Sequence, residues 1–444
     1  MDAIEGALIV VALVAAYFVV LYYLQRTGRL GPDKPLSLFG PALMMKTQQG
    51  RGWLDRAGRF RRLWSALGDL GVLLAGVAMV FIVVLLIWEG LLATQIPASA
   101  APSPQEALGI PGINPIIPIG YGLLALIVGI VLHELAHGVV ARSQGVGVKS
   151  LGILWFVIPV GAFVEQDEEG MNNAPRRRRT RIAAAGVLAN FALCVVFFAL
   201  LGAMVATTVT PNANGVGVSY IVPNSPAAND SLAPGDIITA VNGSSTPTET
   251  ALLNALDNST PGETVPITFY QASTGRTVTI TPVLATSPYD AKRGFLGVGT
   301  SFLTPSQLRQ ELTWPPGSSE GVLGGVVIWI VLPLATLEPV AGSTMSYYHL
   351  SGPLSGLGEN NFWLIANILF WLSWMNFLLG LSNSLPLIPL DGGLLFRDFS
   401  AGVIARLRRG WDSTRIEALA GRLTVASSLL VVFLIVWQFV APRL

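Results

Sequence analysis

Three residues with metal chemistry lie within five positions of the chain. His133 and His137 are four residues apart, and Glu134 lies between them. On a helix, residues four apart fall on one face, so both imidazoles can bind one metal ion while Glu134 lies beside it as a general base. Two neutral nitrogen ligands favour zinc. The pattern therefore predicts a zinc site whose chemistry is metal-assisted hydrolysis.

The surroundings of these residues make a chance match less plausible. They lie in an apolar run over residues 120–143, which is long enough to cross a bilayer. Ionisable side chains are costly inside a membrane segment and indicate function there by default.

The composition of the whole chain agrees with a membrane location. Hydrophobic residues make up 52% of its 444 residues and charged residues only 12%, which is too apolar for one soluble core. The net charge of +1 gives no indication of nucleic-acid binding. We predict a polytopic α-helical membrane protein with about six spans, over residues 4–24, 70–94, 120–143, 182–206, 361–383 and 422–440.

Two apolar segments are ambiguous. The run over residues 4–24 lacks the basic start of a signal peptide and carries Asp2 and Glu5, so we interpret it as a span. A seventh run over residues 322–337 contains Pro333 and precedes Glu338, which predicts an interfacial or re-entrant segment instead of a full crossing.

The distribution of basic residues predicts the orientation. Lys and Arg number nine in residues 25–66, six in 144–181 and five in 392–421, and residues 95–119 have none. The first three stretches are therefore predicted to be cytoplasmic. The N-terminus and the segment that follows residue 206 are predicted to lie outside the cytoplasm.

A catalytic zinc needs a third protein ligand and an open position for water. His349 has the right side chain, but the predicted topology puts it on the outer side. Asp391 follows the span over 361–383 and two prolines, which leaves it near the cytoplasmic side. His133 and His137 lie roughly 20 to 26 Å into their span at 1.5 Å per residue. The two halves of the site thus converge in depth, although Asp-Gly-Gly alone is more often a turn than a ligand.

Several motifs together resemble the site-2 protease family of intramembrane zinc metalloproteases. They are the His-Glu-Leu-Ala-His segment at 133–137, Gly-Val-Leu-Ala-Asn at 186–190, and the segment from Asn383 to Leu-Asp-Gly at 390–392. The resemblance implies that His133, His137 and Asp391 bind one zinc ion per chain and that Glu134 is the general base. It also implies that Asn190 and Asn383 hold substrate or polarise its carbonyl; a polar contact between helices is the alternative for each.

Two departures and one further similarity belong to this resemblance. Val187 stands where the family usually has proline, and the proline spacing after Asn383 is one variant among several. Residues 151–164 are too short to cross a bilayer and predict a hairpin that dips into the membrane. Within it, Gly161 and Phe163 lie in a segment similar to the family's substrate-binding hairpin. An unwound substrate segment is expected to pair with its edge.

Residues 207–300 change to a polar, Gly- and Pro-rich composition with short β-rich runs at 237–241, 265–270 and 277–283. This segment resembles a PDZ domain. Gly215, Val216, Gly217 and Val218 resemble its carboxylate-binding loop, which implies that peptide tails bind there. A generic β-domain acting as a spacer is the alternative.

These expectations give one order of domains along the chain. Residues 1–100 hold two spans and a basic loop, 120–206 the first part of the catalytic membrane core, and 207–300 the PDZ-like domain. Residues 301–360 form the interfacial or re-entrant region, 361–400 the second part of the core, and 401–444 a cytoplasmic segment with the last span.

The function that this organisation predicts is intramembrane zinc proteolysis. The expected substrates are membrane-spanning proteins of the cell membrane, cut near its cytoplasmic side. Two other classes stay open: a catalytically silent adaptor that binds protein tails, which would be free to lose the ligands and Glu134, and a zinc transporter, which would need ionisable residues along several spans.

Overall fold

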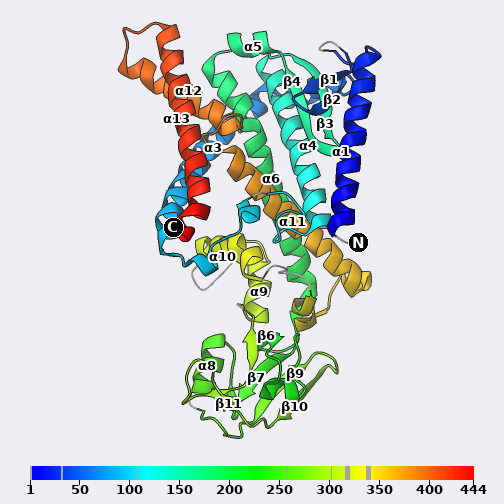
Figure 1. Ribbon diagram of the computed structural model, residues 1–444, viewed down its shortest axis with the longest axis vertical. Coiled ribbons are helices and arrows are strands. Elements are labelled where there is room, and N and C mark those ends of the chain that lie inside the picture. Colours follow the sequence, from blue (N-terminus) through cyan, green and yellow to red (C-terminus); the bar gives the residue numbers. More distant parts are fainter. Residues whose placement is uncertain are drawn as a thin grey trace. The chain divides into compact units, whose positions relative to one another are not determined.

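A computed structural model describes residues 3–31, 34–107, 109–257, 259–301, 303–315, 321–336 and 342–444 (Figure 1). The chain folds into two compact units. The first comprises Met1–Asn114, Gly122–Cys194 and Met375–Leu444, and the second comprises Pro115–Tyr121 and Val195–Trp374. Each unit is described by itself below.

Long apolar helices dominate the chain. Its main helices are α1 (Ala3–Arg26), α3 (Arg61–Leu92), α4 (Ile119–Gln144), α6 (Arg176–Thr208), α11 (Glu359–Asn383), α12 (Asp391–Leu407) and α13 (Ser413–Val440). Among the described residues, five helices are long and apolar enough to cross a membrane: α3, α4, α6, α11 and α13. They match five of the six predicted spans. The sixth falls on α1, and its crossing of the membrane stays a prediction.

The first unit also holds a four-stranded antiparallel sheet of order β1-β2-β3-β4. Its strands are β1 (Leu36–Phe39), β2 (Ala42–Thr47), β3 (Val148–Phe156) and β4 (Ile158–Gln166). The β-hairpin predicted over 151–164 is present as β3 and β4, and its dip into the membrane stays a prediction. The basic stretch predicted between the first two spans contains β1 and β2, which extend this hairpin into a sheet. Strand β4 lies at the open edge.

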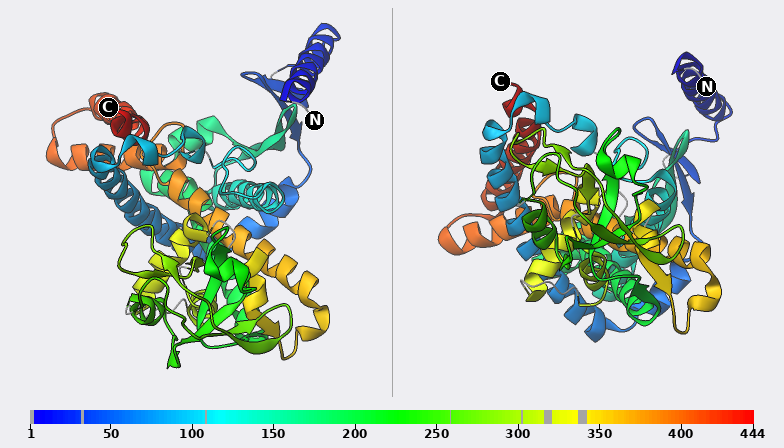
Figure 2. Two further views of the ribbon diagram at one scale, coloured as in Figure 1. Left: turned by 60° about the horizontal axis from the view of Figure 1, so that its bottom comes forward. Right: turned by 90° about the horizontal axis from the view of Figure 1, so that it is seen from below.

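Tyr17 joins α1 to this sheet. Its hydroxyl lies 2.8 Å from the Pro41 carbonyl and 2.9 Å from the Trp155 carbonyl, and it accepts a hydrogen bond of 3.0 Å from the Leu43 amide. The ring packs edge-on against Phe156. Figure 2 shows α1 beside the sheet and far from α13, which closes the opposite side of the first unit.

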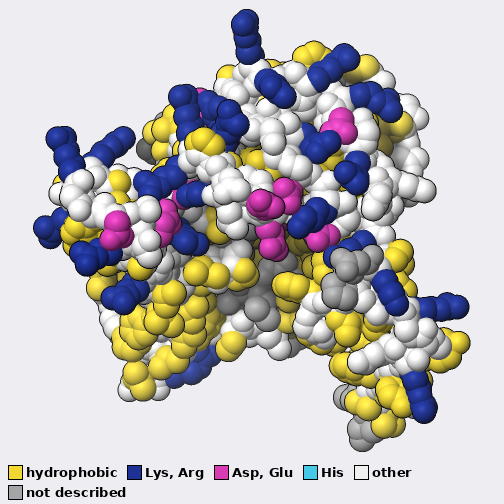
Figure 3. All heavy atoms as spheres, turned by 90° about the horizontal axis from the view of Figure 1, so that it is seen from above, with side chains coloured by type: hydrophobic (Ala, Val, Ile, Leu, Met, Phe, Trp, Pro, Cys, Tyr) yellow, Lys and Arg dark blue, Asp and Glu magenta, His cyan; other side chains and the backbone are white. Residues whose placement is uncertain are grey.

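Two short helices, α2 (Arg51–Gly58) and α5 (Glu168–Asn173), lie in the predicted basic stretches of the first unit. Ion pairs bring these stretches together. Lys46 pairs with Glu165, and Arg176 pairs with Glu417. Figure 3 shows many Lys and Arg side chains gathered on one face of the molecule. This agrees with a shared side of the membrane, and the assignment of that side to the cytoplasm stays a prediction.

The second unit contains a sheet of order β10-β9-β7-β6-β13, with β8 paired to β7. Its strands are β6 (Val216–Ile221), β7 (Ile237–Val241), β8 (Ser244–Ser245), β9 (Ile267–Gln271), β10 (Arg276–Ile280) and β13 (Val298–Thr300). Two small pairs join β11 (Ala285–Thr286) to β12 (Gly294–Phe295) and β5 (Val209–Pro211) to β14 (Tyr348–Leu350). The helices are α7 (Pro226–Asn229), α8 (Glu249–Asp257), α9 (Pro305–Glu311) and α10 (Gly321–Thr336). The β-rich domain is therefore present, and its PDZ identity stays a prediction.

The expected carboxylate-binding loop has a different conformation. Val216, Gly217 and Val218 lie in strand β6, and the Val218 amide already donates to the Asp236 carbonyl. A Cβ at Gly217 would lie 2.5 Å from the Tyr347 ring, so the glycine permits close packing here. Alternating Gly and Val suits a strand whose valines are buried. The prediction of a loop is wrong for these residues, and a peptide-binding role for Gly215 to Val218 stays a prediction.

The seventh apolar run forms α10, a helix of 16 residues with Pro333 inside it. At 1.5 Å per residue it is roughly 24 Å long, shorter than the hydrocarbon layer. Glu338 and Pro339, which supported the interfacial or re-entrant interpretation, lie outside the described residues. That interpretation stays a prediction.

We expect Tyr17→Phe to lower the melting temperature of the detergent-purified protein, because it leaves the buried Leu43 amide without its acceptor. The expected loss is about 1 to 3 kcal/mol of unfolding free energy. Tyr23→Phe is the matched control, since Tyr23 lies on the same helix with its ring exposed. Equal melting temperatures for the two variants would show that the hydroxyl does not hold α1 to the sheet.

Candidate metal centre

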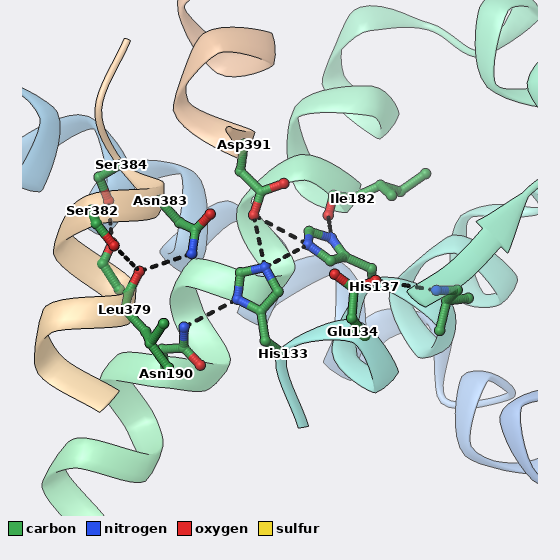
Figure 4. Close-up of polar contacts among 12 residues, drawn as sticks. His133, Glu134, His137, Ile182, Asn190, Leu379, Ser382, Asn383, Ser384 and Asp391 are labelled. Carbon is green, nitrogen blue, oxygen red and sulfur yellow. Dashed lines mark hydrogen bonds and ion pairs between the residues drawn. The ribbon is translucent and has the colours of Figure 1, made fainter. Parts of the chain in front are cut away.

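Three side chains of the first unit converge on one point (Figure 4). His133 Nε2 and His137 Nε2 each lie 3.1 Å from Asp391 Oδ2, and the two nitrogens lie 3.1 Å from each other. Ligand atoms around a tetrahedral zinc with bonds of about 2.0 to 2.1 Å are about 3.3 to 3.4 Å apart. Two imidazoles and one carboxylate in this triangle fit three of the four positions of a catalytic zinc.

Different elements supply the three candidate ligands. His133 and His137 lie one turn apart on α4, and Asp391 is the first residue of α12. A carboxylate is stabilised at a helix N-terminus by the backbone dipoles. A Cβ at Gly392 would lie 2.2 Å from the Leu385 carbonyl oxygen, so glycine is required where the chain folds back on itself. This contact explains why glycine follows Asp391.

A close approach of two helices brings α4 toward α11 at this level. A Cβ at Gly129 would lie only 2.6 Å from Leu379 Cδ1. Gly129 precedes His133 by four residues, so it lies one turn away on the same face of α4. The glycine therefore lets the two helices meet beside the first imidazole.

The outer nitrogen of His137 is fixed by the backbone of α6. His137 Nδ1 lies 2.7 Å from the carbonyl oxygen of Ile182. A carbonyl can only accept, so the hydrogen resides on Nδ1 and the Nε2 lone pair faces Asp391 and His133. This is the arrangement that a metal-binding imidazole needs.

Asn190 has the matching position at His133. Its side-chain nitrogen is drawn 3.1 Å from His133 Nδ1, and its side-chain oxygen is buried without a hydrogen-bond partner among the described residues. Amide oxygen and nitrogen are assigned from the hydrogen-bond network, and a metal-binding Nε2 requires an acceptor at Nδ1. We therefore assign the amide oxygen of Asn190 to this contact.

Gly186 gives the His133 ring its space. A Cβ at this position would lie 2.4 Å from His133 Cε1 and Nε2. Gly186 and Asn190 are one turn apart on α6, so the same helix face provides both the space and the hydrogen bond. Val187, where proline was expected from the resemblance, is fully buried and packs near Leu395 of α12.

Glu134 connects the candidate centre to the sheet. Its Oε2 accepts a hydrogen bond of 3.1 Å from the Val164 amide of β4. Figure 4 shows the carboxylate beside the two imidazoles. The edge strand and the predicted general base are thereby held together.

The other predicted site residues contact residues outside the set of candidate ligands. Asn383 lies beside the cluster in Figure 4, and its amide donates to the Leu379 carbonyl at 3.0 Å. The Phe163 ring lies across Gly152, where a Cβ would be 2.4 Å from its tip. Gly161 has no such close contact, because a Cβ there would be 3.7 Å from the nearest atom. Substrate roles for these three residues stay predictions.

His349 belongs to the second unit. It lies in β14 opposite Thr210, and its Nδ1 is 2.8 Å from Asn212 Oδ1. The group of potential ligands found among the described residues comprises His133, His137 and Asp391.

Sequence reasoning named the candidate ligands and base but missed most of what supports them. The Ile182 carbonyl and the Val164 amide are backbone groups, so the identities of these two residues do not reveal the contacts. The roles of Gly186 and Gly392 could have been suspected from their spacing to Asn190 and Asp391.

The comparisons with known proteins agree with this geometry. A family model described as Peptidase family M50 matches residues 121–431. Uncharacterized protein MJ0971 of Methanocaldococcus jannaschii is 27% identical over 88% of this chain and 84% of its own length. Zinc metalloprotease RasP of Geobacillus kaustophilus is 27% identical over 54% of this chain and 56% of its own length. Regulator of sigma-E protease RseP of Salmonella typhimurium is 31% identical over 28% and 33%, respectively.

We expect Gly186→Ala to weaken zinc binding by about tenfold or more, because the new methyl group displaces the His133 ring from its position. Competition with a chelating dye measures this affinity on purified protein. Gly421→Ala is the matched control, since Gly421 is a helical glycine where an added Cβ would meet no atom within 4 Å. Equal zinc affinity for both variants would mean that Gly186 does not position His133.

Proposed function

Because the chain belongs to peptidase family M50, we propose that it is an intramembrane zinc metalloprotease that cuts membrane-spanning protein substrates. The observation that carries this proposal is the triangle of His133, His137 and Asp391 with Glu134 beside it. Relatives whose names include zinc metalloprotease support the metal and the class of reaction.

The chemistry divides between the metal and the protein. Zinc held by His133, His137 and Asp391 would lower the pKa of a water molecule and polarise the substrate carbonyl. Glu134 accepts the proton of the attacking water and passes it to the nitrogen of the broken peptide bond. One water molecule is consumed, and Glu134 ends as the carboxylate with which it began. The Val164 amide engages Oε2 of this carboxylate, which leaves Oε1 to receive the proton.

The substrate must be extended before it can react. A transmembrane helix keeps its backbone hydrogen bonds internal, so it has to unwind locally to expose a carbonyl. The Val164 amide points away from β3 toward Glu134. Along β4, the backbone N–H and C=O groups of every second residue face the same way. Ala162 therefore also presents its amide and carbonyl at the open edge. We propose that this edge binds the unwound substrate as an added strand.

The remaining site residues have proposed roles in holding that strand. Gly161 and Phe163 alternate with Ala162 along β4 and would flank the bound segment. Asn190 and Asn383 both lie beside His133 in Figure 4, on the side of the candidate centre away from Glu134. We propose that both asparagines hold substrate, and Asn190 does so in addition to its contact with His133.

We also propose that the protein acts in the cell membrane, with the basic stretches of the first unit toward the cytoplasm. The PDZ-like domain would then lie outside and bind peptide tails. The domain order predicted from the sequence is retained in this proposal, with one zinc ion per chain.

We expect Glu134→Gln to reduce cleavage of a model single-span substrate by at least about a hundredfold, because it removes the group that transfers the proton. Bound zinc is expected to stay at the level of the original protein, since Glu134 is not a candidate ligand. Glu168→Gln, at a helix start in the first unit, is the matched control. Equal cleavage by both variants would refute the protease assignment, and zinc binding without cleavage of any substrate would favour the adaptor.

We expect Ala162→Pro to abolish most cleavage, because proline has no amide hydrogen to donate at the edge of β4. Proline is tolerated at an outward-facing position of an edge strand, so zinc binding is expected to persist. Ala162→Ser keeps the amide and serves as the control. Cleavage at the same rate by the two variants would exclude strand addition at this position.

A further inference from the structure

Five arginines crowd the start of α6, at residues 176–179 and 181. The sequence explains them as topological charge, but the structure gives each a partner on another helix. Arg177 and Arg181 pair with Asp69 of α3, and Arg178 donates to the Gln144 carbonyl of α4. The others reach farther along the chain: Arg176 pairs with Glu417 of α13, and Arg179 pairs with Asp398 of α12.

The pair between Arg179 and Asp398 is the most enclosed of these arginine–carboxylate contacts. The side chains are 22% and 12% exposed, whereas Asp69 and Glu417 are 42% and 31% exposed. The contact is bidentate, because Arg179 Nε lies 3.2 Å from Asp398 Oδ2 and Nη2 donates to Oδ1. A bidentate ion pair fixes the relative orientation of the two side chains as well as the distance between them.

Helical spacing aligns this pair with the candidate metal centre. Asp398 follows Asp391 by seven residues, which is nearly two turns, so both carboxylates lie on one face of α12. On α6, Arg179 precedes Gly186 by the same seven residues. The ion pair and the centre therefore connect α6 to α12 at two levels about 10 Å apart along the helices, at 1.5 Å per residue.

The space between the two levels is filled by apolar packing. Leu395 of α12 is fully buried in a cluster with Ala183, Ala184 and Val187 of α6. Small side chains on α6 offer few ridges that could stop α12 from sliding along it. A slide of one residue would move Asp391 by about 1.5 Å and turn it by about 100°. The ion pair opposes both movements.

The segment before Asp391 is tied to α13, because Ser427 Oγ donates to the Pro386 carbonyl and the Ile388 amide donates to Ser428 Oγ. It turns sharply over residues 384–390, with hydrogen bonds from Leu387 to Leu385 and from Leu390 to Leu387. Asp391 is the first residue of α12, so its position depends on the placement of α12 as well as on this segment. We propose that the Arg179–Asp398 ion pair positions Asp391 and thereby sets the zinc affinity of a centre that it does not touch. This inference rests on the proposed zinc function.

The test measures zinc affinity by chelator competition on the full chain, with a detergent melting temperature for each variant. We expect Asp398→Asn to weaken zinc binding by about tenfold, as for other groups that orient a ligand. Exchanging the charges, Arg179→Asp with Asp398→Arg, is expected to restore most of the affinity. A melting temperature alone would not distinguish positioning from stability.

Asp69→Asn is the control. It removes the carboxylate that pairs with Arg177 and Arg181 of α6, and it leaves the Arg179–Asp398 pair between α6 and α12 in place. It is expected to lower the melting temperature while leaving zinc affinity unchanged. Unchanged affinity in Asp398→Asn, or an equal loss in Asp69→Asn, would overturn the positioning role. If the unmodified chain binds no zinc, the proposed function fails together with this inference, whereas the other two outcomes leave the proposed function intact.

Discussion

The strictest demand on this fold comes from two imidazoles and a carboxylate, whose Nε2 and Oδ2 atoms lie 3.1 Å apart inside a bundle of apolar helices. Buried polar atoms are costly unless each has a partner. The fold meets this demand from several elements at once. The Ile182 carbonyl and the Asn190 amide occupy the outer nitrogens of the two histidines, and the Nε2 atoms are left for a metal.

Such a cluster also requires helices to approach more closely than ordinary side chains allow. Glycine provides the space at each contact: Gly129 where α4 meets α11, Gly186 under the His133 ring, and Gly392 behind Asp391. A hydrogen bond from the Val164 amide of β4 to Glu134 joins the proposed general base to the strand proposed to receive substrate.

Much of the candidate centre could be predicted from the sequence, because it depends on the spacing of residues within one helix and on residue counts along single spans. Helical spacing identified His133 and His137, and residue counts along two spans brought Asp391 to the same depth. The strands β1 and β2 were missed because short runs among basic residues carry little periodicity, and their pairing with β3 is long-range. Gly215 to Val218 were predicted as a loop by resemblance, although alternating small and β-branched residues also suit the strand that they form. The partners of the arginines at the start of α6 lie on helices remote in sequence, so no local pattern reveals them.

The central claim is that His133, His137 and Asp391 together hold one zinc ion in the first unit. X-ray absorption spectroscopy at the zinc edge of the purified full chain tests it most directly. The account predicts one zinc per chain with two imidazole ligands and oxygen ligands at about 2.0 to 2.2 Å, and no sulfur. Absence of zinc, a sulfur ligand from the single Cys194, or fewer than two imidazoles would contradict it.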